Sequence, residues 1–214
     1  MKKKARTMRK VLLTVFSAML LVCVTIGATV AYLTSTATVE NTFTVGKVKI
    51  TMDEAAVNTD GTPMQGVARR DNNKYHLLPG HEYTKDPTIH IDDESENAYL
   101  GVKVVLSNMN ATDTLLSGKY EEVLEGFDKT KWNISSVKDT ENDTRIYTLI
   151  YNQQINGETP DIVLFSKVVV PDDLTNEQLA DLQDTTMTIT AYAVQADGFS
   201  DANTALHTAF SSEF

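Results

Sequence analysis

Apolar and polar side chains alternate along residues 43–52 of this chain, which is the period of a strand with one buried face. Gly46 interrupts the alternation, and a glycine between two phases of a strand indicates a bulge or a tight bend. The apolar positions on either side of it are Phe43, Val45, Val48, Ile50 and Met52. We therefore predict an early strand that changes direction near its centre.

Several later segments also have the composition of strands, because they are rich in β-branched and aromatic residues and are bounded by turn-forming residues. The predicted strands are residues 83–91, 98–107, 132–137, 145–151, 162–170 and 187–196. Residues 53–74 are predicted to form a loop, with turn signals at Asp60, Gly61 and Pro63. A second turn is predicted at Pro79 and Gly80.

Three segments have helical spacing instead. Residues 112–127 place one set of apolar side chains on a single side, namely Leu116, Tyr120, Val123, Leu124 and Phe127. Thr175 and Gln178 fit a capping box at the start of a short helix, and residues 200–210 form a short amphipathic pattern. Many strands with small helical insertions predict a mainly β fold, an antiparallel β-sandwich.

The N-terminus has the pattern of an export signal. Six basic residues come first, and residues 11–31 then carry no charge. Thr29 and Ala31 are small, as a cleavage site requires, so we expect a signal peptide of residues 1–31 cut between Ala31 and Tyr32. An uncleaved anchor helix is the alternative, because about 20 apolar residues also suffice to cross a bilayer. Cys23 follows Val22 in the middle of the run, which disfavours a lipoprotein signal.

We expect residues 32–214 to form a single domain. Its charge and cysteine content exclude several classes of function. Cleavage would remove six of the 19 basic residues, leaving 13 against 29 acidic ones. This balance opposes binding to nucleic acid and to anionic lipid, so we expect membrane contact only through the signal segment. Cys23 is the only cysteine, so the cleaved protein would have no disulfide and no cysteine nucleophile.

Candidate metal ligands are few. His81 is followed by Glu82, but position 85 is Lys rather than the second histidine of a zinc protease motif. Zinc held by His81 and His90, or calcium held by Asp92 and Asp93 within an acidic cluster, are the candidate sites. Surface histidines and a solvated acidic turn are the commoner interpretation, and no catalytic constellation is present. We therefore expect no cofactor and no enzymatic activity.

Several stretches together resemble the TasA/camelysin family of exported bacterial proteins. They are "ATVAYLTSTATVENTFTVGKVKI" at residues 28–50, "LLPGHEYTKDPTIHI" at residues 77–91, "NAYLGVKVVL" at residues 97–106 and "AYAVQADGF" at residues 191–199. The order and spacing of these stretches carry the resemblance, whereas residues 108–185 match only in general character. Leu100 and Gly101 stand where Val-Arg is common in the family.

The resemblance implies a jelly-roll-like sandwich, processing by a SipW-like signal peptidase, and a structural role in biofilm matrix or surface fibres of a Gram-positive-type bacterium. It also implies that residues 32–45 donate a strand to a neighbouring copy, giving a head-to-tail homopolymer, with other matrix proteins as further partners. The segment has a suitable apolar pattern, at Ala37, Val39, Phe43 and Val45. Such head-to-tail contacts build filaments because they do not close.

Three alternatives stay open. The strand of residues 32–45 can fold into its own domain, which gives a monomer. Camelysins are also classed as metallopeptidases, so a secreted metalloprotease is a second interpretation. The third is a surface binding module tethered by an uncleaved helix at residues 11–31.

Overall fold

The computed structural model describes residues 34–37, 43–44, 48–116 and 120–214. The chain divides into two units, Met1–Tyr32 and Leu33–Phe214, and all of the described residues belong to the second. The expected signal peptide of residues 1–31 and the cleavage site at Ala31 lie outside the described residues. Within the described ranges, no helix has the length and apolar composition needed to cross a membrane.

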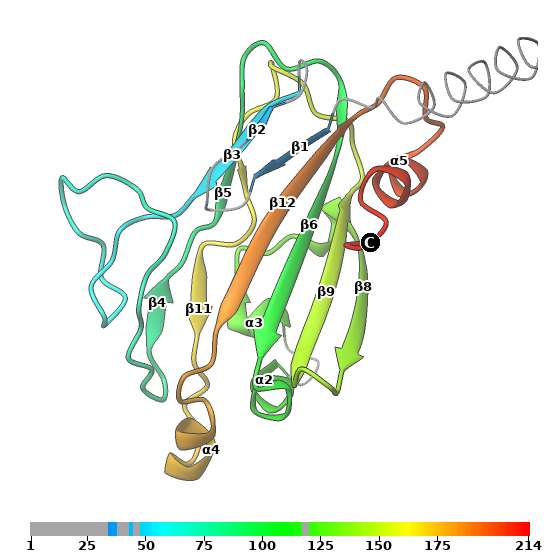
Figure 1. Ribbon diagram of the computed structural model, residues 1–214. Coiled ribbons are helices and arrows are strands. Elements are labelled where there is room, and N and C mark those ends of the chain that lie inside the picture. Colours follow the sequence, from blue (N-terminus) through cyan, green and yellow to red (C-terminus); the bar gives the residue numbers. More distant parts are fainter. Residues whose placement is uncertain (1–33, 38–42, 45–47, 117–119) are drawn as a thin grey trace, which may run out of the picture. The chain divides into compact units, whose positions relative to one another are not determined.

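The largest element is a six-stranded antiparallel sheet (Figure 1). In spatial order its strands are β2 (Phe43–Thr44), β1 (Thr34–Ala37), β12 (Met187–Gln195), β6 (Ala98–Ser107), β9 (Thr144–Tyr151) and β8 (Trp132–Asp139). The four long strands coincide closely with predicted strands. Their pairing joins segments that are distant in sequence, since β12 lies between the N-terminal β1 and β6.

Two small antiparallel sheets complete the β structure. One consists of β10 (Ile162–Val163), β5 (Thr88–Ile91) and β3 (Ile50–Asp53). The other consists of β4 (Glu82–Thr84), β11 (Lys167–Val169) and β7 (Leu124–Glu125). The fold is therefore mainly β with antiparallel sheets and short helices, which is consistent with a β-sandwich.

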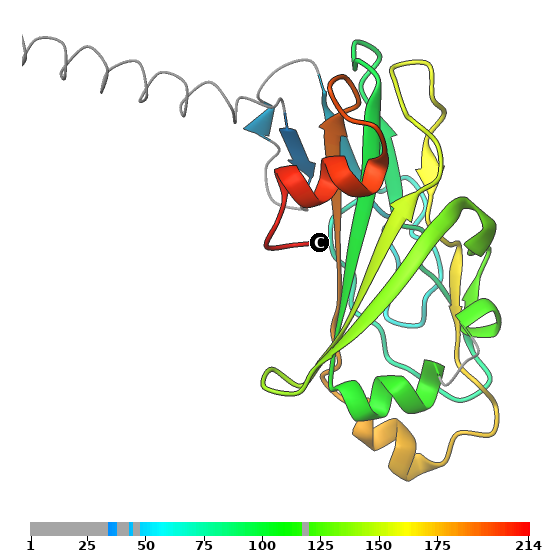
Figure 2. The same cartoon turned by 90° about the vertical axis from the view of Figure 1, so that its right-hand side faces the viewer.

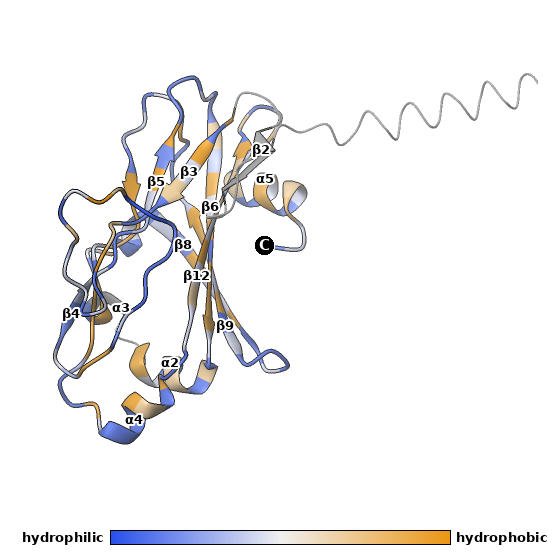
Figure 3. Ribbon diagram, turned by 60° about the vertical axis from the view of Figure 1, so that its left-hand side comes forward, coloured by the Kyte–Doolittle hydropathy of each residue, from blue (hydrophilic) through white to orange (hydrophobic). Residues whose placement is uncertain are grey.

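The main core lies against one face of the six-stranded sheet. Strand β6 shows why, because its even-numbered residues from Ala98 to Leu106 all belong to the main cluster, whereas Tyr99 on the other face belongs to a second, smaller one. Leu100, Val102 and Val104 join a cluster that also contains Ile50 and Ile89 of the small sheets. Figure 3 shows apolar residues concentrated on these strands and hydrophilic residues in the loops.

The opposite face of the sheet is covered by α5 (Ala202–Ala209) and the C-terminal residues (Figure 2). Asp201 caps this helix by accepting a hydrogen bond from the backbone N–H of Thr204. Tyr192 of β12 contacts the rings of Phe210 and Phe214 edge-on, with ring centroids 5.0 and 5.3 Å away. The predicted C-terminal amphipathic helix is confirmed, and its apolar side packs on the sheet.

Two predicted strands are wrong as continuous elements, because each divides between the two small sheets. Residues 83–91 form β4 and β5, and residues 162–170 form β10 and β11. Pro87 lies at the first break, where it cannot donate a backbone hydrogen bond, and its carbonyl accepts one from Leu164 at the second break. The two segments therefore change sheet together.

The predicted helix of residues 112–127 is also wrong in extent. The structure has α2 (Met109–Leu116), α3 (Tyr120–Val123) and then β7, because Leu124 pairs with Val168 of β11. A single turn of 3₁₀ helix, η1 (Lys129–Lys131), leads into β8. The capping box is confirmed at α4 (Asn176–Asp181), where Thr175 and Gln178 exchange hydrogen bonds. The predicted early strand appears as β2 and β3, and residues 45–47 lie outside the described residues.

Candidate functional site

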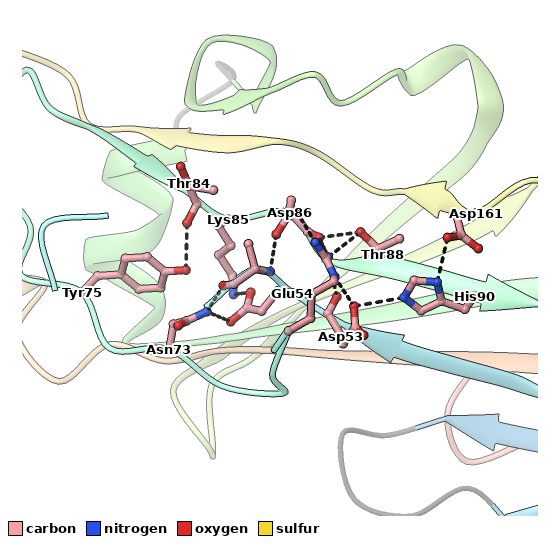
Figure 4. A network of polar contacts seen from close by, with 12 residues as sticks. Asp53, Glu54, Asn73, Tyr75, Thr84, Lys85, Asp86, Thr88, His90 and Asp161 are labelled. Atoms are coloured by element: carbon pink, nitrogen blue, oxygen red, sulfur yellow. Dashed lines mark hydrogen bonds and ion pairs between the residues drawn. The ribbon is translucent and has the colours of Figure 1, made fainter. Parts of the chain in front are cut away.

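A polar network joins the end of β3 to the corner between β4 and β5 (Figure 4). Asp53 and Glu54 come from the end of β3 and the position after it, and Lys85 and Asp86 come from the corner. The network also includes residues of the intervening loop, so it fixes this loop on the small sheets.

The most buried part of the network is an ion pair. Lys85 Nζ lies 2.6 Å from Glu54 Oε2, and only 13% and 7% of the two side chains are exposed. The side-chain amide of Asn73 donates to Glu54 Oε1 at 2.9 Å and to the carbonyl of Ala55 at 2.8 Å. Since removal from water penalises an isolated charge, these partners are what makes the buried carboxylate tolerable.

Tyr75 covers this ion pair from the loop side. Its hydroxyl donates to the carbonyl of Thr84 at 3.1 Å, and the ammonium of Lys85 lies 5.8 Å from its ring centroid. Burial raises the pKa of Tyr75, and the carboxylates of Glu54 and Asp86 raise it further. Tyr75 is therefore a neutral hydrogen-bond donor throughout the ordinary pH range.

Arg69 links two carboxylates at the exposed side of the network. Its Nε donates to Asp53 Oδ1 at 2.5 Å, and its Nη1 donates to Asp86 Oδ2 at 2.8 Å. Its Nη2 also donates to the Thr88 hydroxyl at 2.8 Å. The other oxygen of Asp86 accepts the backbone N–H of Ala55 at 2.6 Å, so this carboxylate holds both the loop and the strand.

His90 of β5 bridges two acidic residues, Asp53 at the end of β3 and Asp161 just before β10. Its Nε2 lies 3.0 Å from Asp53 Oδ1, and its Nδ1 lies 2.8 Å from Asp161 Oδ2. Burial lowers the pKa of His90, but the hydrogen bonds and charges of Asp53 and Asp161 outweigh it, so the pKa is raised. Burial raises the pKa of Asp53, whereas Arg69 and His90 lower it more, and the net direction is down.

The structure does not bring the predicted metal ligands together. His81 stacks at an angle near Tyr83, with ring centroids 6.5 Å apart, while His90 contacts Asp53 and Asp161. Asp92 pairs with Lys49 at 2.7 Å and accepts the backbone N–H of Glu94. Within residues 48–116 and 120–214, no three or more His, Cys, Asp or Glu side chains form a group that could hold a metal.

Asp93 begins the turn that follows Asp92, after the end of β5. The histidine's actual partners were missed because they are distant in sequence: Asp161 is 71 positions away and Asp53 is 37 positions away. Of these residues, only His90 was singled out in the sequence, as a candidate metal ligand. Zinc and calcium were only alternatives to the expectation of no cofactor, and the described residues form no group that could hold either.

A second candidate region is the end of the large sheet where β1 lies between the edge strand β2 and β12. Residues 34–37 pair with residues 191–194 of β12, and Ala37 stands opposite Ala191. Phe43 stands opposite Thr36 in the β1–β2 pair. Of the predicted donor residues, Val39 and Val45 lie outside the described residues, as does Tyr32 at the expected cleavage site. The predicted donor segment is thus placed, where it is described, on its own domain.

An apolar cavity of about 260 Å³ forms a third region, between the large sheet and the segment from α2 to η1. Its lining includes Leu106, Leu116, Phe127, Ile134, Leu149 and Phe165. Among the described residues of the lining, Lys129 is the one that carries a charge. This volume is below the range of typical ligand pockets, which begins at about 300 Å³.

No family model, curated protein or solved structure matches this chain.

The three regions differ in their chemistry. In the polar network, every carboxylate accepts a hydrogen bond from a cationic, amide or histidine side chain or from a backbone N–H, and the network holds a loop in place. Backbone hydrogen bonds join β1 to β12, and the same type of bond forms when a strand from another chain is added to a sheet.

Proposed function

We propose that this chain is an exported structural subunit that assembles into extracellular fibres of a biofilm matrix or cell surface. Assembly proceeds by donation of the N-terminal strand to the next subunit within a jelly-roll-like sandwich. The resemblance to the TasA/camelysin family motivates the proposal. The observation that carries it is the pairing of β1 with β12 near one end of the large sheet, where only the two-residue strand β2 lies outside β1.

This pairing is suited to exchange because it is short and lies near the start of the chain. β1 contributes four residues, which pair with only part of the nine-residue β12. The β12 positions that it covers include Ala191, Ala193 and Val194, which are fully buried. If β1 left, the backbone N–H and C=O groups of β12 that pair with it would lose their partners, and an identical strand from another copy would satisfy them equally well.

Exchange between copies conserves the contacts of the closed monomer, as in domain swapping. The closed form, with β1 paired to its own β12, is therefore the unassembled monomer. The open form, with β1 released, is the one that adds to a fibre. The linear assembly does not close, because each copy receives a strand on one edge and donates its own to another copy. Cleavage at Ala31 would release the segment that begins at Tyr32 for this purpose.

Mixing two cysteine variants tests strand exchange directly. Ser35 pairs with Ala193 in the closed form, so Ser35→Cys and Ala193→Cys are placed on separate copies of exported chain in a Cys23→Ala background. We expect a disulfide-linked heterodimer when the two preparations are mixed under fibre-forming conditions. Pairing Ser35→Cys with Ala191→Cys is the out-of-register control, for which we expect little product.

Electron microscopy of the intact exported chain and of a variant lacking residues 32–41 completes the test. Unchanged fibres from the shortened variant would refute strand donation, and the absence of fibres from the intact chain would refute the proposed function. Incubation with casein, with and without zinc and a chelator, distinguishes the metalloprotease. Chelator-sensitive cleavage that is lost in His81→Ala would favour that alternative.

A further inference from the structure

Strand β8 forms the edge of the large sheet opposite to β1 and β2. In the part of the chain that the structure describes, no strand pairs with the outer side of β8. Figure 2 looks onto this edge, where the light-green strand crosses the front. An edge strand presents backbone N–H and C=O groups that pair readily with another chain, and natural proteins usually obstruct such edges.

The hydrogen-bonding pattern shows which backbone groups face outward. The N–H of Asn152 donates to the carbonyl of Lys131, so Lys131 and the alternate residues after it face β9. The residues between them, Ile134, Ser136 and Lys138, therefore direct their N–H and C=O groups away from the sheet. The N–H of Trp132 has a partner already, the carbonyl of Lys129.

The central side chains of β8 do not obstruct this edge. Residues 133–137, "NISSV", carry no charge and are all exposed. Ile134 is 46% exposed and Val137 is 63% exposed, although both are apolar and lie in a strand. The charged residues stand only at the two ends, Lys131 on one side and Lys138 and Asp139 on the other. A strand with these features is a template for pairing.

We propose that β8 is an interface between two copies of this chain, which pair antiparallel through their β8 strands. A two-fold axis perpendicular to the sheet relates two such strands and keeps the same face of each sheet on the same side. Residues that stand opposite each other must then both be even-numbered or both be odd-numbered. The possible registers thus differ by whole two-residue steps.

Charge complementarity selects the register in which Ser135 stands opposite Ser135. Lys131 of each copy then stands opposite Asp139 of the other, so the two-fold axis creates two opposite-charge pairs. Lys131 is available for this contact, because 59% of its side chain is exposed and its nearest recorded anion, Asp128, is 3.8 Å away. The same register places Ile134 opposite Ser136, with both backbones facing the partner.

This inference does not depend on the proposed function. Strand donation uses the β12 edge, whereas the β8 contact uses the opposite edge and closes as a dimer. The contact involves a single strand, so it is smaller than a standard stable interface, and we expect an association that depends on protein concentration. An exported chain that never forms fibres would still dimerise through β8.

Cysteine cross-linking tests the register. In the proposed pair, Ser135 faces its own counterpart at a non-hydrogen-bonded position, where Cα atoms are about 4.5 Å apart, within disulfide range. Ser136 is the matched control, since its counterpart lies diagonally at about 7–8 Å. We expect mild oxidation of exported Ser135→Cys chain, in a Cys23→Ala background, to give a disulfide-linked dimer that Ser136→Cys does not give.

Two further variants test the contact without a cysteine. Ser136→Pro removes an outward N–H but no bond to β9, so we expect loss of the dimer in sedimentation velocity, whereas Ser136→Ala keeps it. Lys131→Glu should also abolish the dimer, and adding Asp139→Lys should restore it. Asp139 also accepts the backbone N–H groups of Glu141 and Asn142, so the melting temperature of each variant is measured alongside.

The cross-linking and sedimentation results together decide whether β8 is an interface. Cross-linking of Ser135→Cys alone, with loss of the dimer in Lys131→Glu and its return in the double variant, supports the interface. Equal cross-linking at both positions, or a monomer at every concentration in the unsubstituted chain, overturns it. If Ser136→Pro proves unstable, the Lys131→Glu result decides, because that residue is exposed and outside the core.

Discussion

Lys85 Nζ lies 2.6 Å from Glu54 Oε2 in a nearly buried ion pair that joins the end of β3 to the corner before β5. Removing one partner leaves the other charge buried without compensation. We therefore expect Lys85→Met to lower the free energy of unfolding by about 3–5 kcal/mol. Urea denaturation followed by circular dichroism measures the change.

The double variant Glu54→Leu with Lys85→Met is the matched control for this prediction. Replacing both charges with apolar groups removes the desolvation penalty as well as the attraction, so we expect stability close to that of the unsubstituted chain. A Lys85→Met variant with unchanged stability would contradict the importance of the pair. Asn73 would keep its hydrogen bond to the Ala55 carbonyl in either variant.

The bridge formed by His90 makes stability depend on pH in a defined direction. The pKa of His90 is raised in the folded state above the ordinary value of 6.5, because Asp53 and Asp161 favour the protonated ring despite burial. Its contribution is therefore complete below about pH 6.5, the unfolded value, and is lost as pH rises through the raised folded pKa. Denaturation midpoints measured between pH 6 and 9 should fall over this interval.

His90→Gln serves as the control, since its side chain does not titrate. We expect the part of the pH dependence that lies just above the ordinary histidine pKa to disappear in this variant. The acidic limb should remain, because the pKa of Asp53 is lowered by Arg69 as well as by His90, and that contribution is lost only as pH falls. An unchanged profile in His90→Gln would contradict the assignment.

Gly101 and Phe214 illustrate a contact that depends on the lack of a side chain. A Cβ atom at Gly101 would overlap the ring of Phe214 and would lie 3.0 Å from Leu206 Cδ1. We expect Gly101→Ala to destabilise the protein by about 1–3 kcal/mol, as overpacking does. Thermal unfolding of Gly101→Ala, Phe214→Ala and the double variant measures the coupling. Additive effects would contradict the contact.

The C-terminal residue Phe214 occupies the space beside Gly101. Lys103 and Glu213 form an ion pair at 2.8 Å beside it, which fixes the end of the chain on the sheet.

The hydroxyl group of Tyr83 can be tested by a substitution that removes this group alone. Its side chain is 1% exposed, and its hydroxyl donates to the His76 carbonyl at 2.7 Å and accepts the Leu78 N–H at 2.7 Å. Tyr83→Phe leaves both backbone groups without this partner, so we expect a loss of about 1–3 kcal/mol. Urea denaturation gives the value, and amide hydrogen exchange at Leu78 reports the local opening. Unchanged exchange would contradict the prediction.

The sequence predicted the elements that depend on local pattern. Strands β6 and β12 are runs of nine or more residues rich in apolar side chains, and the capping box at Thr175 is read directly from neighbouring residues. The long strands could be placed because burial on both faces of β6 makes almost every residue apolar. The order of strands in the sheet could not be inferred, since β1 and β12 come from opposite ends of the chain.

The candidate site was harder to predict because its contacts are long-range. Arg69 lies in a strongly polar loop, and nothing in its neighbours indicates that it joins Asp53 to Asp86. His90 was recognised as a candidate ligand, but its partners come from β3 and from the residue before β10. The division of residues 83–91 between two sheets required knowing that Pro87 lies beside Leu164.

The position of β1 also sets an order on folding. A polypeptide is synthesised from its N-terminus, so residues 34–37 emerge long before residues 191–194, their partners in β12. The first strand must therefore wait, without its partner, until almost the whole chain is complete. Closure of this long loop is the slowest type of contact to form, because its entropic cost precedes any gain from pairing. During that interval, the first strand of one molecule can pair with the last strand of another molecule as readily as with its own.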